Sequence, residues 1–201
     1  RWATQRKSAR VLLVIDISGS MSDTADPATG DTKLDLAKRA ALESLDEFKP
    51  EDEVGVRVFS TNLGPQSMDY ELDLVPIAAI GGQSETIRTE ILRLFPTNGT
   101  PLYDVAGSAF RTMYESYDPS RINAVVLLTD GMNDDGDPSD DRMQLDRLVA
   151  DLEAETQGEN SRPVRVFTIG YGGDAALSVL RRIAAARNGA THYASDPATI
   201  E

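Results

Sequence analysis

The stretch Val11-Leu-Leu-Val-Ile-Asp-Ile-Ser-Gly-Ser20 decides the fold that we predict for this chain. Five apolar residues, three of them β-branched, run without interruption into the carboxylate of Asp16. A strand that is buried on both faces has this pattern, and such strands belong to parallel sheets covered by helices. The stretch therefore predicts an α/β fold with a buried strand that ends at an acidic residue.

Three oxygen-bearing side chains mark the end of this strand at every second position, Asp16, Ser18 and Ser20. Side chains spaced in this way can converge beyond the carboxyl end of a sheet, where open α/β folds bind their ligands. Oxygen ligands without His or Cys suit Mg²⁺, Mn²⁺ or Ca²⁺ and suit zinc poorly. We therefore expect a site for a hard divalent cation at this loop.

Apolar stretches and helical patterns alternate along the rest of the chain. We expect further strands at residues 54–59, 70–77, 122–129, 163–170 and 190–194. Pro76 places the strand at 70–77 on an edge of the sheet. The alternation predicts a doubly wound, Rossmann-like sheet of about six strands, mostly parallel with one antiparallel edge strand, flanked by helices.

Polar residues and prolines mark where the intervening helices begin. Thr32 or Asp31, Ser84 and Ser139 are predicted N-caps, and Asp174 is predicted to start the last helix. Pro101 is predicted at the first helical position with Thr100 just before it. The hydroxyl of Thr100 would then either cap this helix or point outward.

The 201 residues fit one domain with a sizeable core. We expect this domain at residues 10–201, with residues 1–9 as a basic lead-in or linker. The chain starts at Arg1 without Met and ends within a pattern typical of a helix start, so we expect an excised part of a longer protein. No apolar run approaches the roughly 18 residues that span a bilayer, so this segment is not expected to insert into a membrane.

The net charge and the absence of cysteine argue against several kinds of function. The chain has 33 acidic and 20 basic residues, a net charge of −13, which repels nucleic acid phosphates and favours cations or basic partner surfaces. It has no cysteine, which excludes disulfides, thiolate metal sites and Cys nucleophiles. A role in binding DNA or RNA is therefore not expected.

Two further positions strengthen the prediction of a cation site. Thr100 heads a predicted helix after a glycine, and Asp130 ends a second buried strand. In a doubly wound sheet the loops that carry Asp16, Thr100 and Asp130 can meet at one edge. Two buried acids that face each other there would be costly without a cation.

The segments Asp16-Ile-Ser-Gly-Ser20, Gly99-Thr-Pro-Leu-Tyr-Asp104 and Thr129-Asp-Gly131 resemble the motifs of von Willebrand factor type A (VWA) domains, of which the integrin I-domain is the best-known relative. The resemblance extends from Arg10 to Ala194. It matches all five positions of the family's metal-ion-dependent adhesion site, which are Asp16, Ser18, Ser20, Thr100 and Asp130.

This resemblance implies how the five residues would act. The serines would bind the ion directly, the two acids partly through water, and Thr100 directly or through water according to the state of the domain. Because only two ligands are charged, the ion would keep a position open to solvent for an Asp or Glu carboxylate of a partner protein. The expected function is metal-dependent, adhesion-type protein binding without catalysis, with Mg²⁺ as cofactor and Mn²⁺ or Ca²⁺ as alternatives.

The expected setting is the outside or surface of a bacterial cell, within a larger and membrane-anchored protein, with the cytoplasm as the alternative. One competing hypothesis is a Mg²⁺-dependent phosphoryl-transfer enzyme with Asp16 as nucleophile. That chemistry wants a second acid two residues on, where this chain has Ser18, and no lysine is placed by the sequence to neutralise a phosphoryl group. The other is a subunit that docks on an ATPase ring, as in metal chelatases.

Two acidic loops and a set of flanking residues complete the candidates. The loops at residues 23–31 and 134–141 could each hold Ca²⁺, but neither has the terminal Glu of an EF-hand, and solvated acidic loops are the default expectation. Residues next to the motifs are predicted to form the rim that selects the partner: Met21, Asn62, Tyr103 and Met132.

Overall fold

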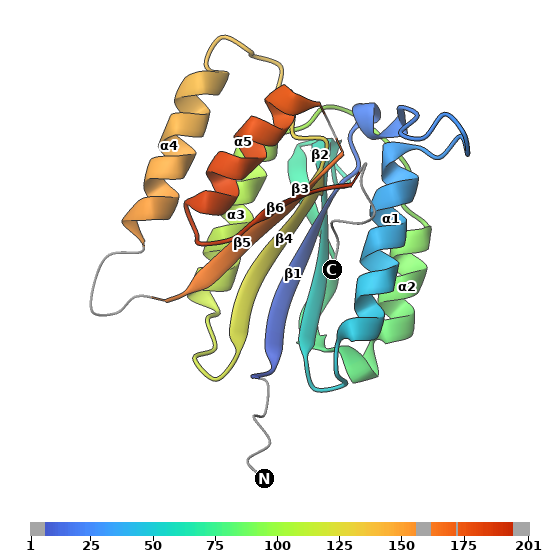
Figure 1. The fold of residues 1–201 in the computed structure, drawn as a ribbon, viewed down its shortest axis with the longest axis vertical. Helices are drawn as coiled ribbons and strands as arrows, with labels where there is room; N and C mark the ends of the chain where they lie inside the picture. Colours follow the sequence, from blue (N-terminus) through green and yellow to red (C-terminus); the bar gives the residue numbers. More distant parts are fainter. Residues whose placement is uncertain (1–6, 156–161, 172, 195–201) are drawn as a thin grey trace.

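A six-stranded sheet runs through the middle of the computed structural model, and helices cover both of its faces (Figure 1). The structure describes residues 7–155, 162–171 and 173–194. The strands are β1 (Ala9–Asp16), β2 (Glu53–Leu63), β3 (Asp69–Ala79), β4 (Ile122–Thr129), β5 (Val164–Gly170) and β6 (Thr191–Tyr193). The α-helices are α1 (Lys33–Ser44), α2 (Ser84–Leu92), α3 (Leu102–Glu115), α4 (Asp141–Ala154) and α5 (Asp174–Ala185).

The strand order β3-β2-β1-β4-β5-β6 confirms the predicted fold class. β1 pairs in parallel with both β2 and β4, and β5 and β6 continue the parallel sheet. Only β3 is antiparallel, and it lies at the edge, where the missing N–H of Pro76 is tolerated. The chain leaves β1 toward one side of the sheet and returns to its other side at β4. The carboxyl ends of these two strands therefore form the switch point where α/β sheets bind ligands.

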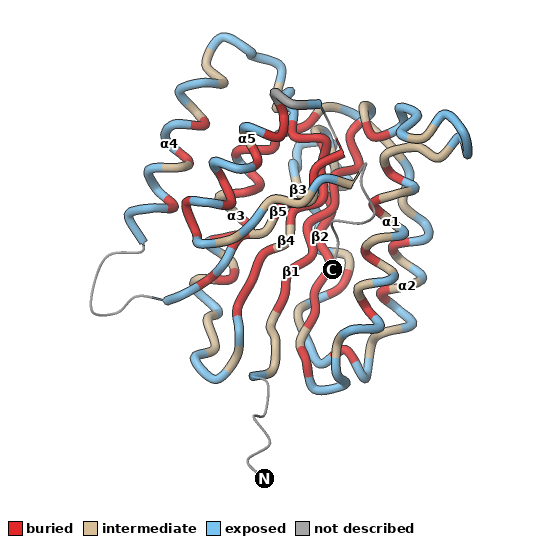
Figure 2. The backbone as a smooth tube through the Cα atoms, viewed as in Figure 1, coloured by how far each residue is buried: buried red, intermediate tan, exposed pale blue. Residues whose placement is uncertain are grey.

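Two apolar clusters lie on opposite faces of the sheet, and β1 contributes to both. Leu12 and Val14 pack with residues of α3, α4 and α5. Leu13 and Ile15 pack with residues of α1 and α2 on the other face. Figure 2 shows the resulting band of buried backbone along β1, β2 and β4. This burial on both faces is the reason for the uninterrupted apolar run from Val11 to Ile15.

The last residue of the predicted lead-in already belongs to the sheet. β1 begins at Ala9, whose backbone N–H donates to Oδ1 of Asp52, and the carbonyl of Ser8 accepts from the N–H of Ile122. Residues 1–6 lie outside the described residues. Within the described ranges, no helix is long and apolar enough to cross a membrane.

The structure differs from two of the predicted helix starts. Thr32 caps α1 through a reciprocal capping box with Asp35, as predicted. Ser84, however, lies inside the first turn of α2, because the side-chain amide of the preceding Gln83 donates to three backbone carbonyls and fixes the entry to the helix. The predicted cap Ser139 is also wrong. Its N–H and hydroxyl both donate to Asp137, and α4 begins only after Asp140.

Candidate functional site

Backbone hydrogen bonds join the loop after β1 to the segment that precedes α3. The N–H of Gly19 donates to the carbonyl of Asn98 at 2.7 Å, and the N–H of Thr97 donates to the carbonyl of Ile17 at 2.6 Å. A Cβ on Gly19 would lie 2.9 Å from the carbonyl oxygen of Thr97, closer than side chains tolerate. Glycine is therefore required at position 19 for the two segments to approach each other.

Thr100 is fixed by the loop that follows β4, and this changes the predicted start of α3. Its N–H and carbonyl both pair with the backbone of Asp134 at 2.8 Å. This bridge keeps Thr100 out of the helix, so α3 begins at Leu102, Pro101 is its N-cap, and Thr100 does not cap it. The same bridge holds the buried Thr100 between the end of β1 and the loop after β4.

Asp16 is fully buried, and both of its carboxylate oxygens accept hydrogen bonds. The N–H of Ser18 donates to Oδ1 at 2.8 Å, and the hydroxyl of Thr129 donates to Oδ2 at 2.5 Å. The hydroxyls of Ser18 and Ser20 share a hydrogen bond of 3.2 Å. The first motif is thus one connected set of oxygen atoms at the carboxyl end of β1.

The electrostatic setting of Asp16 disfavours its charge. Burial, and to a smaller extent the negative charge of Asp130, raise the pKa of Asp16, whereas the hydrogen bonds from Thr129 and Ser18 lower it; the net result is a pKa of about 6. The two acids are therefore close enough to repel each other, as expected for strands that end side by side. A cation between them would relieve both burial and repulsion.

Asp130 is 2% exposed, and its two oxygens have different surroundings. Oδ2 accepts a hydrogen bond from Nζ of Lys33 at 3.0 Å, whereas Oδ1 is buried and has no hydrogen-bond partner among the described residues. A buried carboxylate oxygen without a donor is costly unless a cation or water satisfies it. Oδ1 of Asp130 is the atom of this site whose bonding is least complete.

Lys33 was missed by sequence reasoning, which placed no lysine at this edge and left the two acids without compensation. Burial lowers the pKa of Lys33, but the hydrogen bonds and charges of Asp130 and Asp23 outweigh it, so that the pKa is raised and the side chain stays an ammonium. A signal was present in the sequence. Lys33 follows the cap Thr32, and a cation in the first turn of a helix opposes the helix dipole unless an anion is near.

A cleft of about 390 Å³ opens beside these residues. Ser20, Asn98 and Thr100 line one side of it. The loop after β4 and the start of α4 line the other side with Met132, Asn133, Asp134, Asp135, Gly136, Pro138 and Asp141. Ser20 and Thr100 therefore share a hollow whose lining includes three acidic residues, Asp134, Asp135 and Asp141.

The structure corrects part of the predicted rim. Met132 is 56% exposed and lines the cleft, and Asn62 is exposed but does not line it. Met21 is fully buried in the cluster beneath α1, because the turn after Ser20 directs it inward. Tyr103 is likewise buried, against the opposite face of the sheet. Proximity in sequence to a motif was an insufficient criterion for exposure.

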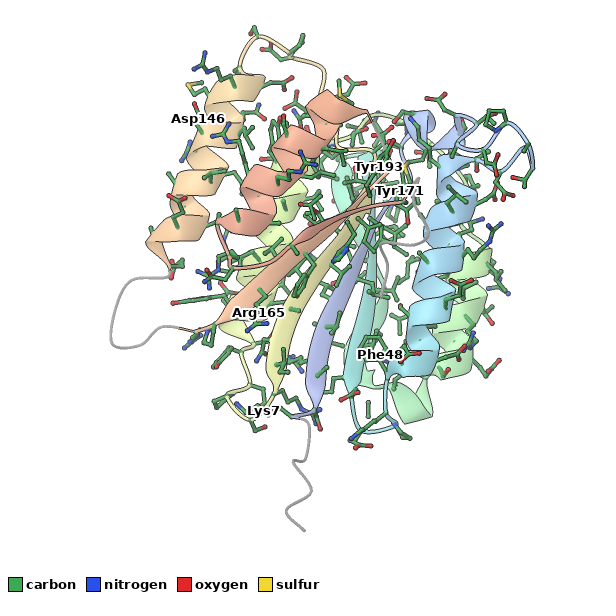
Figure 3. The ribbon with its side chains drawn as sticks, viewed as in Figure 1. Lys7, Phe48, Asp146, Arg165, Tyr171 and Tyr193 are labelled. Carbon is green, nitrogen blue, oxygen red and sulfur yellow. The ribbon has the colours of Figure 1, made fainter. Side chains whose placement is uncertain are left out.

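A second hollow of about 250 Å³ lies beside Lys33. It is lined by Thr24, Ala25, Lys33, Leu36, Tyr171, Gly173, Tyr193 and Ala194. Tyr171 and Tyr193 lie near each other in space, at the carboxyl ends of the neighbouring strands β5 and β6 (Figure 3). The hydroxyl of Tyr171 is buried without a partner among the described residues, and burial raises its pKa well above the ordinary value.

The acidic loops at residues 23–31 and 134–141 do not gather their carboxylates. Within the described ranges, no three His, Cys, Asp or Glu side chains form a group that could hold a metal ion. Several of the carboxylates instead accept hydrogen bonds from their own turns, such as Asp26 from the N–H of Ala28 and Asp137 from Ser139. The turns of these loops therefore supply hydrogen-bond donors to their own carboxylates.

The five predicted positions fit a hard divalent cation in their chemistry. Hydrogen bonds link Asp16, Ser18 and Ser20, the cleft joins Ser20 to Thr100, and charge repulsion couples Asp130 to Asp16. Three hydroxyls and two carboxylates are a donor set for Mg²⁺ or Mn²⁺. Because the set contains only two acids, it does not form an acidic cluster like those of all-carboxylate sites.

Comparison with known proteins agrees with this geometry. Residues 11–201 match the family model described as von Willebrand factor type A domain. Human inter-alpha-trypsin inhibitor heavy chain H4 is 26% identical over 179 residues, which are 87% of this chain and 17% of that protein. The chain spans well under half the length of the curated relatives that it matches.

Solved structures share the fold. A von Willebrand factor type A protein from Catenulispora acidiphila superposes with a TM-score of 0.64 at 24% identity, covering 96% of this chain and 40% of that one. The manganese-loaded TRAP protein of Plasmodium vivax superposes with a TM-score of 0.58 at 16% identity, covering 89% of this chain and 63% of that one.

Proposed function

Because the chain belongs to the von Willebrand factor type A family, we propose that it is a protein-binding module that depends on a divalent cation. In this proposal Asp16, Ser18, Ser20, Thr100 and Asp130 hold the ion at the carboxyl edge of the sheet. The family is generally one of adhesion and protein interaction, which supports binding rather than catalysis. The single observation that carries the proposal is Oδ1 of Asp130, a buried carboxylate oxygen without a donor beside the buried Asp16.

The ligand set explains why a bound ion would serve binding. When present, the ion supplies a positive centre that accepts an oxygen ligand from solvent or from another protein. The chain's own part is to hold neutral hydroxyls and only two carboxylates around that centre. Mg²⁺ is the proposed cofactor, with Mn²⁺ as a close alternative that the manganese-loaded relative supports.

The partner is proposed to be a protein that presents an Asp or Glu carboxylate to the ion. Asp134, Asp135 and Asp141 line the cleft beside Ser20 and Thr100, and the whole chain carries a net charge of −13. A uniformly acidic partner would be repelled by this rim. The proposed partner surface is therefore basic around its one coordinating carboxylate, and the same negative charge disfavours nucleic acid as a partner.

We propose that this domain lies at the bacterial cell surface, within a longer membrane-anchored protein. The adhesin-like members of the family, which are extracellular or surface proteins, support this setting.

Metal-dependent stabilisation tests the ion site. At a hundredfold excess over its Kd, Mn²⁺ should stabilise the folded protein by about 2.7 kcal/mol, which raises the Tm of a domain of this size by about 5–10 °C. Ser18→Ala and Asp130→Asn should abolish this gain. Asp134→Asn removes an exposed carboxylate from the same cleft and is the matched control, which should respond like the wild type. If the ligand variants respond as the control does, the site is elsewhere.

A peptide library displayed on phage tests the function itself. Peptides selected on the Mn²⁺-loaded domain should share one Asp or Glu among basic residues. Their binding should be lost with EDTA and on exchange of that acid for its amide. Selection of peptides that bind equally well with EDTA would contradict the proposed mode of binding.

The position of Lys33 removes one argument against the phosphoryl-transfer alternative, because a lysine does lie beside the acids. The other argument stands, since Ser18 occupies the place of the general acid and donates its N–H to Asp16. A panel of small phosphoesters with Mg²⁺ distinguishes the two functions. Turnover that disappears in Asp16→Asn would establish the enzyme in place of the binding module.

A further inference from the structure

Lys33 is a cation that the folded chain itself places against the candidate metal site. Its Nζ lies 3.0 Å from Oδ2 of Asp130 and 3.1 Å from Oδ2 of Asp23. The side chain of Lys33 is only 17% exposed. Lys33 is not one of the five proposed ligands, yet it contacts one of them directly.

The backbone around Lys33 is fixed, so the ammonium group stays close to Asp130. Its N–H donates to the carbonyl of Asp23 at 3.0 Å. The capping box of Thr32 and Asp35 fixes the first turn of α1, and the neighbouring Leu34 is buried in the core. The lysine therefore extends toward the carboxyl edge of the sheet from a well-anchored helix start.

The two carboxylates that contact Lys33 do not attract its ammonium group equally strongly. Asp23 is 65% exposed, and solvent screens an ion pair at such a position. Asp130 is 2% exposed, so its attraction to the ammonium is screened much less. Because Lys33 stands at a helix N-terminus, where positive charge is disfavoured, Asp130 is the group that holds it there.

We propose that Lys33 sets the charge of the cation site, weakening the binding of the metal ion and leaving the loaded site with one net positive charge for an anionic ligand. This inference rests on the proposed function. A divalent ion between Asp16 and Asp130 is neutral by formal charge, so its open position attracts a carboxylate of a partner less strongly than a site with a net positive charge would. Lys33 on Oδ2 of Asp130 leaves Oδ1 for the ion and adds the missing positive charge.

Mn²⁺ binding to variants of Lys33 tests this inference. In calorimetric titrations, Lys33→Met and Lys33→Gln should bind Mn²⁺ more tightly than the wild type, by on the order of tenfold. Tenfold is the scale of repulsion between a divalent ion and a unit charge across one carboxylate in bulk water, and it is therefore a lower bound for this mostly buried site. Lys33→Arg keeps the charge and should bind as the wild type does. Lys38→Met removes a lysine from the same helix, away from the site, and is the control for net charge.

Thermal unfolding of the same proteins gives a second readout. Without metal, Lys33→Met should have a lower Tm, because Asp130 then remains buried without a partner. The rise in Tm on adding Mn²⁺ should be larger than in the wild type. Lys33→Gln retains a hydrogen-bond donor and serves if Lys33→Met does not fold.

The outcomes separate the two proposals. If the wild type does not bind Mn²⁺, the proposed function fails and this inference falls with it. If the wild type binds but Lys33→Met and Lys33→Gln bind equally or more weakly, Lys33 does not set the charge of the site and only this inference is overturned. A tenfold gain that also appears in Lys38→Met would be an effect of net charge and would overturn it as well.

Discussion

The hydroxyl of Thr129 donates a hydrogen bond of 2.5 Å to Oδ2 of Asp16 and so joins the carboxyl ends of β4 and β1. Both residues are fully buried. Together with the N–H of Ser18 on Oδ1, this bond fixes the orientation of the Asp16 carboxylate before any ligand arrives. Preorganisation of this kind lowers the cost of assembling an ion site.

Thr129→Val should weaken both the fold and the binding of metal. The N–H of Gly131 donates to the hydroxyl of Thr129 and would lose its acceptor in the buried interior, at a cost of about 1–3 kcal/mol. Loss of the bond to Asp16 should also lower Mn²⁺ affinity, by about tenfold to a hundredfold for a residue that orients a ligand. Denaturant unfolding and calorimetry measure the two effects.

Thr168→Val is the control for this prediction. Thr168 is also fully buried, and its hydroxyl donates to Thr191 on the neighbouring strand at 2.7 Å. Its replacement should destabilise the fold without changing Mn²⁺ affinity. Equal losses of affinity in the two variants would show that Thr129 acts through stability alone.

Asp16 should make the stability of the metal-free protein depend on pH. Its pKa in the folded protein, about 6, lies above the ordinary value of 3.8, so the folded state binds this proton more tightly than the unfolded chain. The contribution of the Asp16 carboxyl to the free energy of unfolding is fully present below pH 3.8 and is lost as the pH rises through about 6. The loss is on the order of 3 kcal/mol.

Asp16→Asn tests this dependence because the amide carries no charge at any pH. In EDTA at pH 7.5 the variant should be more stable than the wild type, and at pH 5 the difference should shrink. Urea unfolding at the two pH values measures it. The same variant should gain nothing from Mn²⁺. A difference in stability that does not change between the two pH values would contradict the raised pKa.

Gly19→Ala should separate the loop after β1 from the segment before α3. The new Cβ would lie 2.9 Å from the carbonyl oxygen of Thr97, which is held by backbone bonds on both sides. We expect a loss of about 1–3 kcal/mol from overpacking, with weaker Mn²⁺ binding because Ser18 and Ser20 flank the glycine.

Gly82→Ala is the matched control, since a Cβ there meets no atom within 4 Å. It should leave both the free energy of unfolding and the Mn²⁺ affinity near the wild-type values. Unchanged Mn²⁺ binding in Gly19→Ala would show that the close approach to Thr97 does not position the serines.

The sheet was predictable because burial leaves its pattern in consecutive residues. The apolar runs of β1 and β4 identify strands with helices on both sides, and Pro76 identifies the edge strand. The proximity of Asp16 and Asp130 could be predicted because each residue ends such an apolar run. Topology places the ends of neighbouring parallel strands at one edge of the sheet.

The rest of the site depends on contacts between distant residues. Lys33 and Asp130 are 97 positions apart, and although a lysine in the first turn of a helix indicates a nearby anion, the local sequence does not identify that anion as Asp130. Thr100 was expected at a helix start by local rules, but its bridge to Asp134 overrides them. Met21 follows the motif in sequence and yet packs in the core, because the direction of one turn decides its exposure.

A crystal structure of the domain soaked in Mn²⁺, with anomalous diffraction recorded at the manganese absorption edge, tests whether the five residues share one ion. We expect a single strong peak at the carboxyl ends of β1 and β4, bonded to the hydroxyls of Ser18 and Ser20 at about 2.0–2.3 Å. Asp16, Thr100 and Asp130 should bind the ion directly or through its waters. A peak in the acidic loops alone, or no peak within reach of the two serines, would contradict the proposed site.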